Sequence, residues 1–297
     1  MRIGIDLGGT KIAAIVLDPE GRRVWEAREA TPRDDYAGTV GVMAALVAAA
    51  EAAAGAVCTV GVGTPGAISP ATGLVKNANS TWLNGRPFRA DLERALGRGV
   101  RLSNDANCLA MSEVADGEAA GARVVFGVIL GTGVGGGLVV DGRVLDGANA
   151  IAGEWGHNPL PWPGDDERPG PACYCGRAGC VETFLSGPGL AADYARSGGA
   201  PVSGREVVER AAVAEPIGTA ALDRWCARLA RALATVINVV DPDVIVVGGG
   251  LSRVARLYED VPRQWSRWVF SDAVRTRLLP ARHGDASGAR GAARLWP

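Results

Sequence analysis

The chain has 297 residues, enough to bury a core in two α/β domains or one large one. Its formal net charge of −1 presents no field of one sign, which argues against nucleic acid or a membrane as partner and favours a small molecule. Residues 1–20 lack the unbroken apolar core of a signal peptide, and the longest apolar stretch, residues 42–56, is too short to span a bilayer, so we expect a cytoplasmic protein.

The predicted elements alternate strands with helices. Apolar residues 2–5 form a first strand that ends in the turn DLGGTK, and β-branched residues 12–17 form its antiparallel partner. Segment 66–87 is a long polar excursion of the kind that carries function, and segment 160–172 is a surface loop rich in proline and glycine. Further patterns predict helices over 36–54, 88–96, 105–116, 220–239 and 288–295, and strands over 59–63, 100–102 and 244–247. This order is typical of a layered α/β sheet.

The opening pattern returns at residue 124. There VVFGVILGTGVGGGLVVDGRVL repeats the strand, glycine turn and strand of RIGIDLGGTKIAAIVLDPEG. Two such hairpins suggest two related domains, each presenting a Gly-Thr turn to a shared cleft. The alternative on pattern alone is that glycine-rich hairpins recur by accident.

Three glycine turns at strand ends, residues 8–10, 131–133 and 248–250, are candidates for phosphate binding. Glycine lets the backbone approach phosphate oxygens, and successive free N–H groups form an anion-binding concavity. Thr10 and Thr132 add hydroxyl donors and Lys11 adds a positive charge, so together the turns favour nucleotide binding over mere tight hairpins. None matches the P-loop pattern, and a strand follows GTGVGG where a dinucleotide fingerprint requires a helix.

The cluster CYCGRAGC holds three of the six cysteines. Cytoplasmic thiols are kept reduced, so such a cluster indicates metal binding or redox chemistry more than disulfides, and no pair here has the redox spacing C-x-x-C. With the histidine of GEWGH it reads H-x15-C-x-C-x4-C, the one nitrogen and three sulfurs of a closed structural zinc site. A disulfide or free thiols are the alternative. The candidate ligands are His157, Cys173, Cys175 and Cys180, and the isolated Cys58, Cys108 and Cys226 are expected to be small buried hydrophobes.

Four carboxylates stand where they could take part in chemistry. Asp6 closes the first strand, where it either helps to hold Mg²⁺ near a transferring phosphoryl group or stabilises the turn. Asp105, in SNDANC, is either a first-turn residue favoured by the helix dipole or a rigidly held acceptor for the proton of an attacking hydroxyl. Glu154 and Glu182 flank the cysteine cluster and either bind sugar hydroxyls or lie at the surface.

Together the motifs DLGGTK, NDANC, GTGVGGG, GEWGH, CYCGRAGCVE and VIVVGGG resemble, over essentially the full length, the ROK family of repressors and sugar kinases. The resemblance is strongest to bacterial fructokinases that also act on mannose, through TPRDDY, VKNANSTWLNG, GEWGHNPLPW and ARHGDASGARGAARLWP. It implies an actin-like (ribonuclease-H-like) ATPase fold, with two α/β domains that close over ATP and a hexose, usually as a homodimer. Residues 1–108 with the C-terminal helix 284–297 would form a small domain, and residues 109–283 a large domain with a zinc-bearing loop, 153–182.

The resemblance also implies roles for individual residues. Asp105 matches the catalytic base, and His157 would bind zinc through one ring nitrogen and face the sugar with the other. The residues expected to bind the sugar are Asn79, Asn104, Asp105, Glu154, His157 and Glu182. Those expected to bind the nucleotide are Asp6, Gly8, Gly9, Thr10, Lys11, Thr132, Gly133, Gly249 and Gly250. The zinc ligands would be His157, Cys173, Cys175 and Cys180.

These matches predict ATP-dependent phosphorylation of a free hexose at its 6-hydroxyl, most specifically of D-fructose, with mannose as a further substrate. The expected cofactors are ATP, catalytic Mg²⁺ and structural Zn²⁺. A glucokinase or another hexose kinase is the alternative within enzymes. From another class, the rival is a non-catalytic sugar-sensing repressor, which would carry a helix-turn-helix ahead of a first strand that here begins at Arg2.

Overall fold

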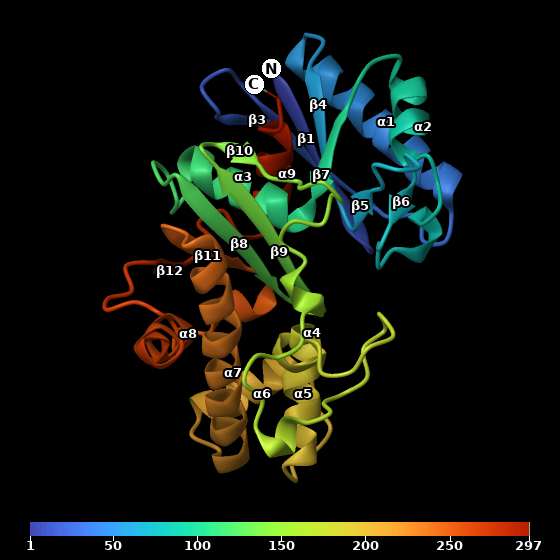
Figure 1. The fold of residues 1–297 in the computed structure, drawn as a ribbon. Coiled ribbons are helices and arrows are strands. Elements are labelled where there is room, and N and C mark those ends of the chain that lie inside the picture. Colours follow the sequence, from blue (N-terminus) through green and yellow to red (C-terminus); the bar gives the residue numbers. More distant parts are fainter. Residues whose placement is uncertain (297) are drawn as a thin grey trace. The chain divides into compact units, whose positions relative to one another are not determined.

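The computed structural model describes residues 1–296, whose strands form two main sheets with the same order (Figure 1). The first sheet runs β3-β2-β1-β4-β7 and the second β10-β9-β8-β11-β12, so in both an antiparallel ribbon is followed by two parallel strands. This shared order confirms the predicted repeat. The first sheet comprises β1 (Arg2–Leu7), β2 (Lys11–Leu17), β3 (Arg23–Ala30), β4 (Thr59–Thr64) and β7 (Arg101–Asn104). The second comprises β8 (Val124–Leu130), β9 (Val134–Val140), β10 (Arg143–Val144), β11 (Val244–Gly248) and β12 (Arg277–Pro280), and β5 (Ala67–Ile68) pairs with β6 (Val75–Lys76).

Three helices have the bounds that the sequence predicts. These are α1 (Tyr36–Ala54), α2 (Phe88–Leu96) and α3 (Asp105–Asp116). Their ends carry ordinary signals: Asp35 caps α1 by accepting from the N–H of Gly38, and Gly55 and Gly97 end α1 and α2 in the left-handed region. The other helices are α4 (Val181–Leu185), α5 (Gly187–Arg196), α6 (Gly204–Ala212), α7 (Pro216–Val240), α8 (Leu257–Asp260) and α9 (Ser287–Ala293). Helix α7 begins one turn before the predicted 220–239 because Glu215 caps it, and α9 spans 287–293 where the sequence predicts 288–295.

Helix α1 is apolar and long enough, by composition alone, to cross a membrane. Its buried residues Met43, Leu46 and Val47 belong to one core cluster with Ile3 and Ile5 of β1. A core helix of a soluble protein passes the same test of length and hydropathy, so we interpret α1 as part of the core.

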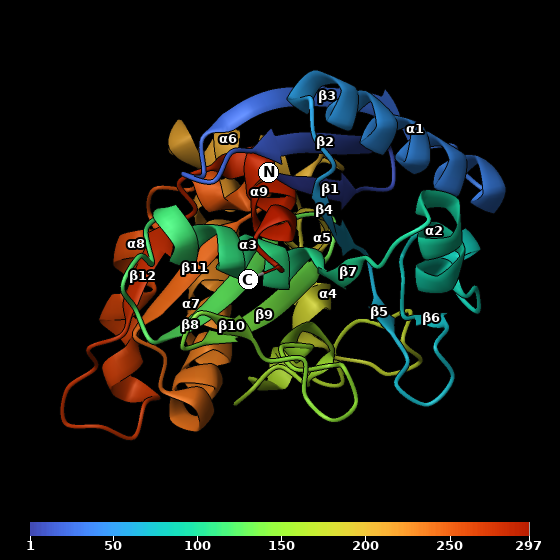
Figure 2. The same ribbon diagram turned by 90° about the horizontal axis from the view of Figure 1, so that it is seen from above.

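The chain divides into two compact units. The first comprises residues 1–121, 137–152 and 282–297, and the second comprises residues 122–136 and 153–281. In the first unit α9 lies against β1, β4 and α3 (Figure 2). The helix approaches the strands at two glycines, since a Cβ on Gly4 would lie 1.9 Å from the carbonyl oxygen of Ala289 and one on Gly61 only 1.8 Å from that of Ala292. A side chain at either glycine would therefore push α9 off the sheet.

The second unit contains a buried ion network around α7. Arg228 donates to Glu167 at 2.7 Å and to Asp193 at 2.8 Å, and Arg231 also donates to Glu167. Although burial acts to raise it, these hydrogen bonds hold the pKa of Glu167 at about 2. Most of segment 160–172 is exposed loop, as predicted, but Glu167 is buried, because its carboxylate accepts hydrogen bonds from the arginines of α7.

Candidate functional site

Asp6 lies at the end of β1, beside the turn that leads into β2. It stands opposite Ala13 in the register of the hairpin, and the turn closes with a hydrogen bond from the N–H of Gly8 to the carbonyl oxygen of Lys11. A Cβ on Gly288 of α9 would lie 2.6 Å from the Asp6 carboxyl carbon, so glycine at that position leaves room for the carboxylate. The fold thus holds Asp6 half-buried between the sheet and α9.

The structure brings Asp6, Lys11 and Asp105 into one electrostatic neighbourhood. Burial and the charge of Asp105 raise the pKa of Asp6, Lys11 opposes both, and the net value is about 6. The ammonium group of Lys11 is 3.5 Å from the carboxylate of Asp285, and both side chains are largely exposed. Two carboxylates that repel each other beside a glycine turn are a donor set that suits Mg²⁺.

Asn104 and Asp105 occupy the junction where β7 meets α3. The side-chain oxygen of Asn104 caps the helix by accepting from the N–H of Asn107 at 2.7 Å, and Asp105 accepts from the N–H of Ala106 at 2.8 Å. Asp105 itself is exposed. A capped helix start directly after a strand gives this carboxylate a fixed backbone, as the sequence predicts.

A cavity of about 370 Å³ in the first unit lies beside this junction. Its lining includes Thr64, Ser103, Asn104, Asn107 and Asp146. This volume is at the small end of the range for ligand pockets.

Neither Asp105 nor Asn79 is among the residues that line this cavity. Asn79 is exposed and precedes Ser80, whose hydroxyl lies 3.7 Å from the position of a Cβ on Gly9. Asn79 thus belongs to a segment beside the first glycine turn. Ser80 is buried and its hydroxyl has no hydrogen-bond partner among the described residues, a feature that no sequence motif signals.

In the second unit the other two glycine turns come together at the end of β8. A Cβ on Gly249, which has a φ of 83°, would lie 2.4 Å from the carbonyl oxygen of Leu130. Glu182 joins the same place, because its carboxylate accepts from the N–H of Val134 at 2.8 Å. A Cβ on Gly133 would lie 2.6 Å from that carboxylate oxygen, so the absence of a side chain at Gly133 leaves space for the Glu182 carboxylate. The remaining predicted residues of these turns, Thr132 and Gly250, are exposed to solvent.

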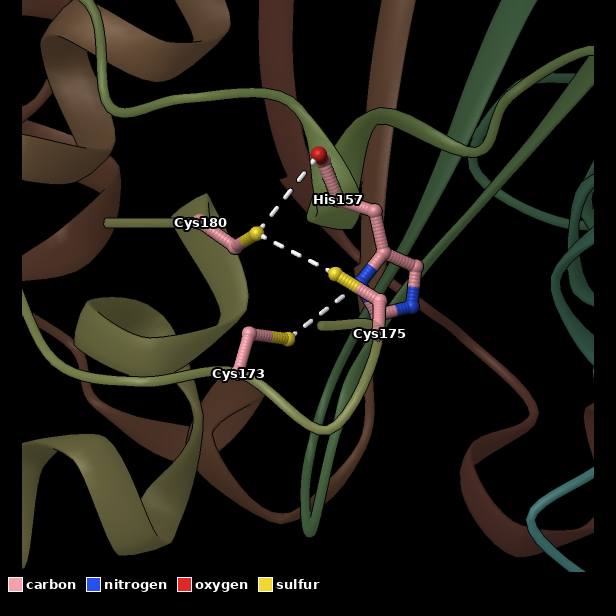
Figure 3. A group of neighbouring side chains, drawn as sticks. All are labelled: His157, Cys173, Cys175 and Cys180. Carbon is pink, nitrogen blue, oxygen red and sulfur yellow. Dashed lines mark hydrogen bonds between the residues drawn. The ribbon is translucent and has the colours of Figure 1, made fainter. Parts of the chain in front are cut away.

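The four candidate metal ligands converge in the second unit (Figure 3). Their ligand atoms all lie within 4.8 Å of one another, with the Cys173 sulfur 3.6 Å from Nδ1 of His157. The sulfurs of Cys175 and Cys180 are 3.6 Å apart, well beyond the roughly 2.05 Å of a disulfide bond. Three sulfurs and one imidazole nitrogen around one point fit a tetrahedral metal ion. The isolated cysteines, Cys58, Cys108 and Cys226, are buried as predicted.

The second ring nitrogen of His157 contacts a residue that the sequence does not single out. Nε2 lies 3.0 Å from the hydroxyl of Tyr174, and the two rings meet edge to face. Partial desolvation, together with the negative charges of Glu182 and Glu154, raises the pKa of Tyr174 to about 12. Tyr174 therefore lies among Glu154, His157 and Glu182. In this structure the nitrogen expected to face a sugar hydroxyl faces a tyrosine hydroxyl instead.

Two sheets of one order, each opening with a glycine-turn hairpin, define an actin-like ATPase fold of two α/β domains. The chain belongs to the ROK family, which it matches over residues 2–297. It is 40% identical over 299 residues to the N-acetyl-D-glucosamine kinase of Pectobacterium atrosepticum, covering 99% of this chain and 98% of that protein. The ROK hexokinase of Thermus thermophilus is 33% identical with a TM-score of 0.87, covering 99% of this chain and 97% of that one. A ROK glucokinase from Streptomyces griseus, solved with glucose and AMPPNP, is 28% identical with a TM-score of 0.79, covering 99% and 98%.

Proposed function

We propose that this protein is an ATP-dependent sugar kinase that phosphorylates a free hexose at its 6-hydroxyl. The observation that carries the proposal is that Asp6 and Lys11, at the first glycine-turn hairpin, lie close enough to Asp105, at the start of α3, for their charges to interact. Membership of the ROK family and the sugar kinases among similar proteins support it. Phosphoryl transfer asks a protein chiefly for positioning and for neutralisation of charge, and this arrangement offers both.

In the proposed reaction Asp105 accepts the proton of the hexose 6-hydroxyl while that oxygen bonds to the γ-phosphorus. The bond from the γ-phosphorus to the β,γ-bridging oxygen breaks, and ADP leaves with that oxygen. Backbone N–H groups of the glycine turns at residues 8–10 and 131–133 bind phosphate oxygens. A bound Mg²⁺ would offset the phosphate charge, and Asp6 is the residue that we assign to hold it, directly or through water.

We assign a structural role to a zinc ion held by His157 and the three cysteines of the cluster. Helix α4 starts at Val181, directly after Cys180, and carries Glu182 one residue later. The ion would therefore fix the start of the helix whose carboxylate reaches the second glycine turn. Four protein ligands leave no open coordination position, so the ion would take no part in the reaction.

Our first candidate substrate is D-fructose, with mannose beside it. This choice rests on the resemblance of segment 75–85, VKNANSTWLNG, and of TPRDDY to fructokinases. N-acetyl-D-glucosamine is the second candidate, favoured by relatives that are 38–40% identical and named as its kinases. Glucose is the third, through the glucokinase of similar structure.

The test is ADP release by the purified protein with fructose, mannose, glucose and N-acetylglucosamine, each with ATP and Mg²⁺. We expect kcat/KM for fructose to exceed that for the other sugars. A preference for N-acetylglucosamine would reject the fructose assignment while leaving the kinase assignment intact. No turnover with any hexose, together with binding to operator DNA, would favour the rival repressor. Cytoplasmic location and a homodimer stay predictions, which fractionation and light scattering address.

A further inference from the structure

The first unit holds a second and larger cavity, of about 680 Å³. It shares Arg89, Leu102, Ser103 and Asp146 with the smaller cavity beside Asn104. Its other walls come from β7, from the segment around β10 and from residues 294–296. The chemistry proposed above makes no use of this cavity.

Positive charge dominates its lining. Four arginines line it, namely Arg89, Arg101, Arg143 and Arg294, and Asp146 is the one carboxylate among the described lining residues. Burial raises the pKa of Asp146, an effect that the nearby charge of Arg89 opposes, and Arg294 lies 3.5 Å from Asp116. Asp116 does not line the cavity and is shared with Arg290, and the guanidinium groups of Arg101 and Arg143 are not matched by any ion pair described for residues 1–296.

Arg101 is held in place by its neighbours. Its guanidinium packs over the ring of Trp296 at 4.5 Å and donates to the carbonyl oxygen of Leu295 at 2.6 Å. The indole of Trp296 is fixed in turn by a hydrogen bond from Nε1 to the carbonyl oxygen of Val60 at 2.7 Å. A guanidinium fixed against an aromatic ring loses little side-chain entropy when an anion binds to its remaining N–H groups.

A buried hydroxyl also lines this cavity. Ser103 is 8% exposed, and its Oγ is buried with no hydrogen-bond partner among the described residues. On β7 it stands two residues from Arg101, so both side chains lie on one face of the strand. Buried hydroxyls are nearly always hydrogen-bonded, and a ligand oxygen in the cavity would supply the missing partner.

We propose that this cavity is a binding site for a small phosphate monoester. Arg101 and Arg143 bind the phosphate group, with Ser103 as a further donor. The apolar wall, which includes Met111, Leu295 and Trp296, contacts the carbon skeleton. Because β7 leads from Arg101 directly to Asn104, an occupied site changes the affinity of the pocket beside Asn104. That consequence rests on the proposed function, whereas the binding itself does not.

The experiment follows the indole N–H signal of Trp296 in ¹⁵N NMR spectra, assigned with a Trp296→Phe variant. Fructose 6-phosphate is titrated at constant ionic strength, with AMPPNP and Mg²⁺ present to occupy the nucleotide site. We expect a saturable shift of that signal, and at least tenfold weaker binding in Arg101→Gln and in Arg143→Gln. Arg33→Gln is the matched control, because Arg33 is an exposed arginine of the first unit that lines neither cavity.

No saturable shift, an equal shift with sodium sulfate or chloride, or unchanged binding in both cavity variants would overturn the site. If Arg101→Gln disturbs the packing on Trp296, Arg143→Gln still tests the site, because no contact with Trp296 is described for Arg143. In a second arm, the hexose KM is measured with and without inorganic phosphate in wild type and Arg143→Gln. If the protein lacks kinase activity, only this arm fails, and the NMR titration still decides the binding site.

Discussion

The two hairpins that open the two sheets have the same backbone arrangement, but one carries charged side chains where the other carries apolar ones. Each has a strand, a turn of three residues and a returning strand. At the next-to-last position of the first strand, one hairpin has Asp6 and the other Ile129. At the first position of the returning strand, one has Lys11 and the other Val134. The two hairpins therefore share the backbone turn that offers N–H groups, whereas the charged side chains at these two positions occur only in the first hairpin.

The second hairpin obtains its carboxylate from another element. Glu182 of α4 reaches the N–H of Val134, at the position where the first hairpin has Lys11. An acid carried by the strand is fixed by the sheet, whereas an acid carried by a five-residue helix depends on what fixes that helix. In this protein the residue just before α4 is Cys180, a member of the metal cluster. The two hairpins should therefore respond differently to changes at their acids.

The largest effect is expected from Asp105→Asn. Loss of the proton acceptor should lower kcat by roughly 10²- to 10⁴-fold, the usual contribution of a general base, while sugar binding is kept. Glu182→Gln, which changes the carboxylate at the second hairpin, should instead raise the sugar KM. Steady-state kinetics and calorimetric sugar binding measure both. Near-normal turnover of Asp105→Asn would remove the asymmetry that we assign to the two units.

Removal of the metal tests what holds Glu182. We expect one zinc per chain by elemental analysis, and a chelated protein that loses a few kcal/mol of stability together with sugar affinity. Cys175→Ser should reproduce both losses. Cys226→Ala, at a buried cysteine outside the cluster, is the control that should keep its zinc. Full stability and affinity after chelation would mean that α4 is fixed without the ion.

Burial of Asp6 gives the first hairpin a pH-dependent stability. Its folded pKa of about 6 exceeds the ordinary 3.8, so the folded state binds the proton more tightly and the destabilisation grows as pH rises from about 4 to above 6. Asp6→Asn should therefore raise the free energy of unfolding at pH 7.5 by about 1–3 kcal/mol and leave it little changed at pH 4. Urea denaturation of the metal- and nucleotide-free protein measures this, and a variant that is less stable at pH 7.5 would contradict it.

The sequence alone predicts these hairpins well and the contacts between distant segments poorly. Helices α1, α2 and α3 have their predicted bounds because caps and glycine stops mark their ends locally. Helix α4 has five residues, too few to show a helical period. The inward position of Glu167 depends on arginines 61 and 64 residues further along the chain, and no local pattern announces them.

The candidate site divides in the same way. Residue types and spacing predict the metal cluster, because ligand sets repeat at recognisable intervals. The contact of Tyr174 with His157 depends on how the loop 158–173 returns, which spacing does not specify. The hydroxyls of Ser80 and Ser103 become notable only because the fold buries them without hydrogen-bond partners among residues 1–296.

Gly133→Ala tests whether the second turn needs glycine at this position to make room for Glu182. A Cβ at residue 133 lies 2.6 Å from the Glu182 carboxylate, which must then release the N–H of Val134. We expect a loss of about 1 kcal/mol in stability, the worth of one such hydrogen bond, and a higher sugar KM. Gly131→Ala is the control in the same turn, where an added Cβ meets no atom within 4 Å. Equal effects of the two variants would show that the turn needs glycine for its backbone and not for Glu182.

The smallest effect is expected from Tyr174→Phe. The side chain is 74% exposed, so loss of its hydroxyl should change stability by less than about 0.5 kcal/mol. The hydroxyl occupies Nε2 of His157, the nitrogen that we expect a sugar hydroxyl to reach. Removing it frees that nitrogen, so the sugar KM should fall by a few-fold with kcat unchanged. Calorimetric sugar binding checks the result, and a KM that rises would mean that the tyrosine hydroxyl binds the sugar itself. In that case the second unit would hold its substrate through a residue that stands between two of its metal ligands.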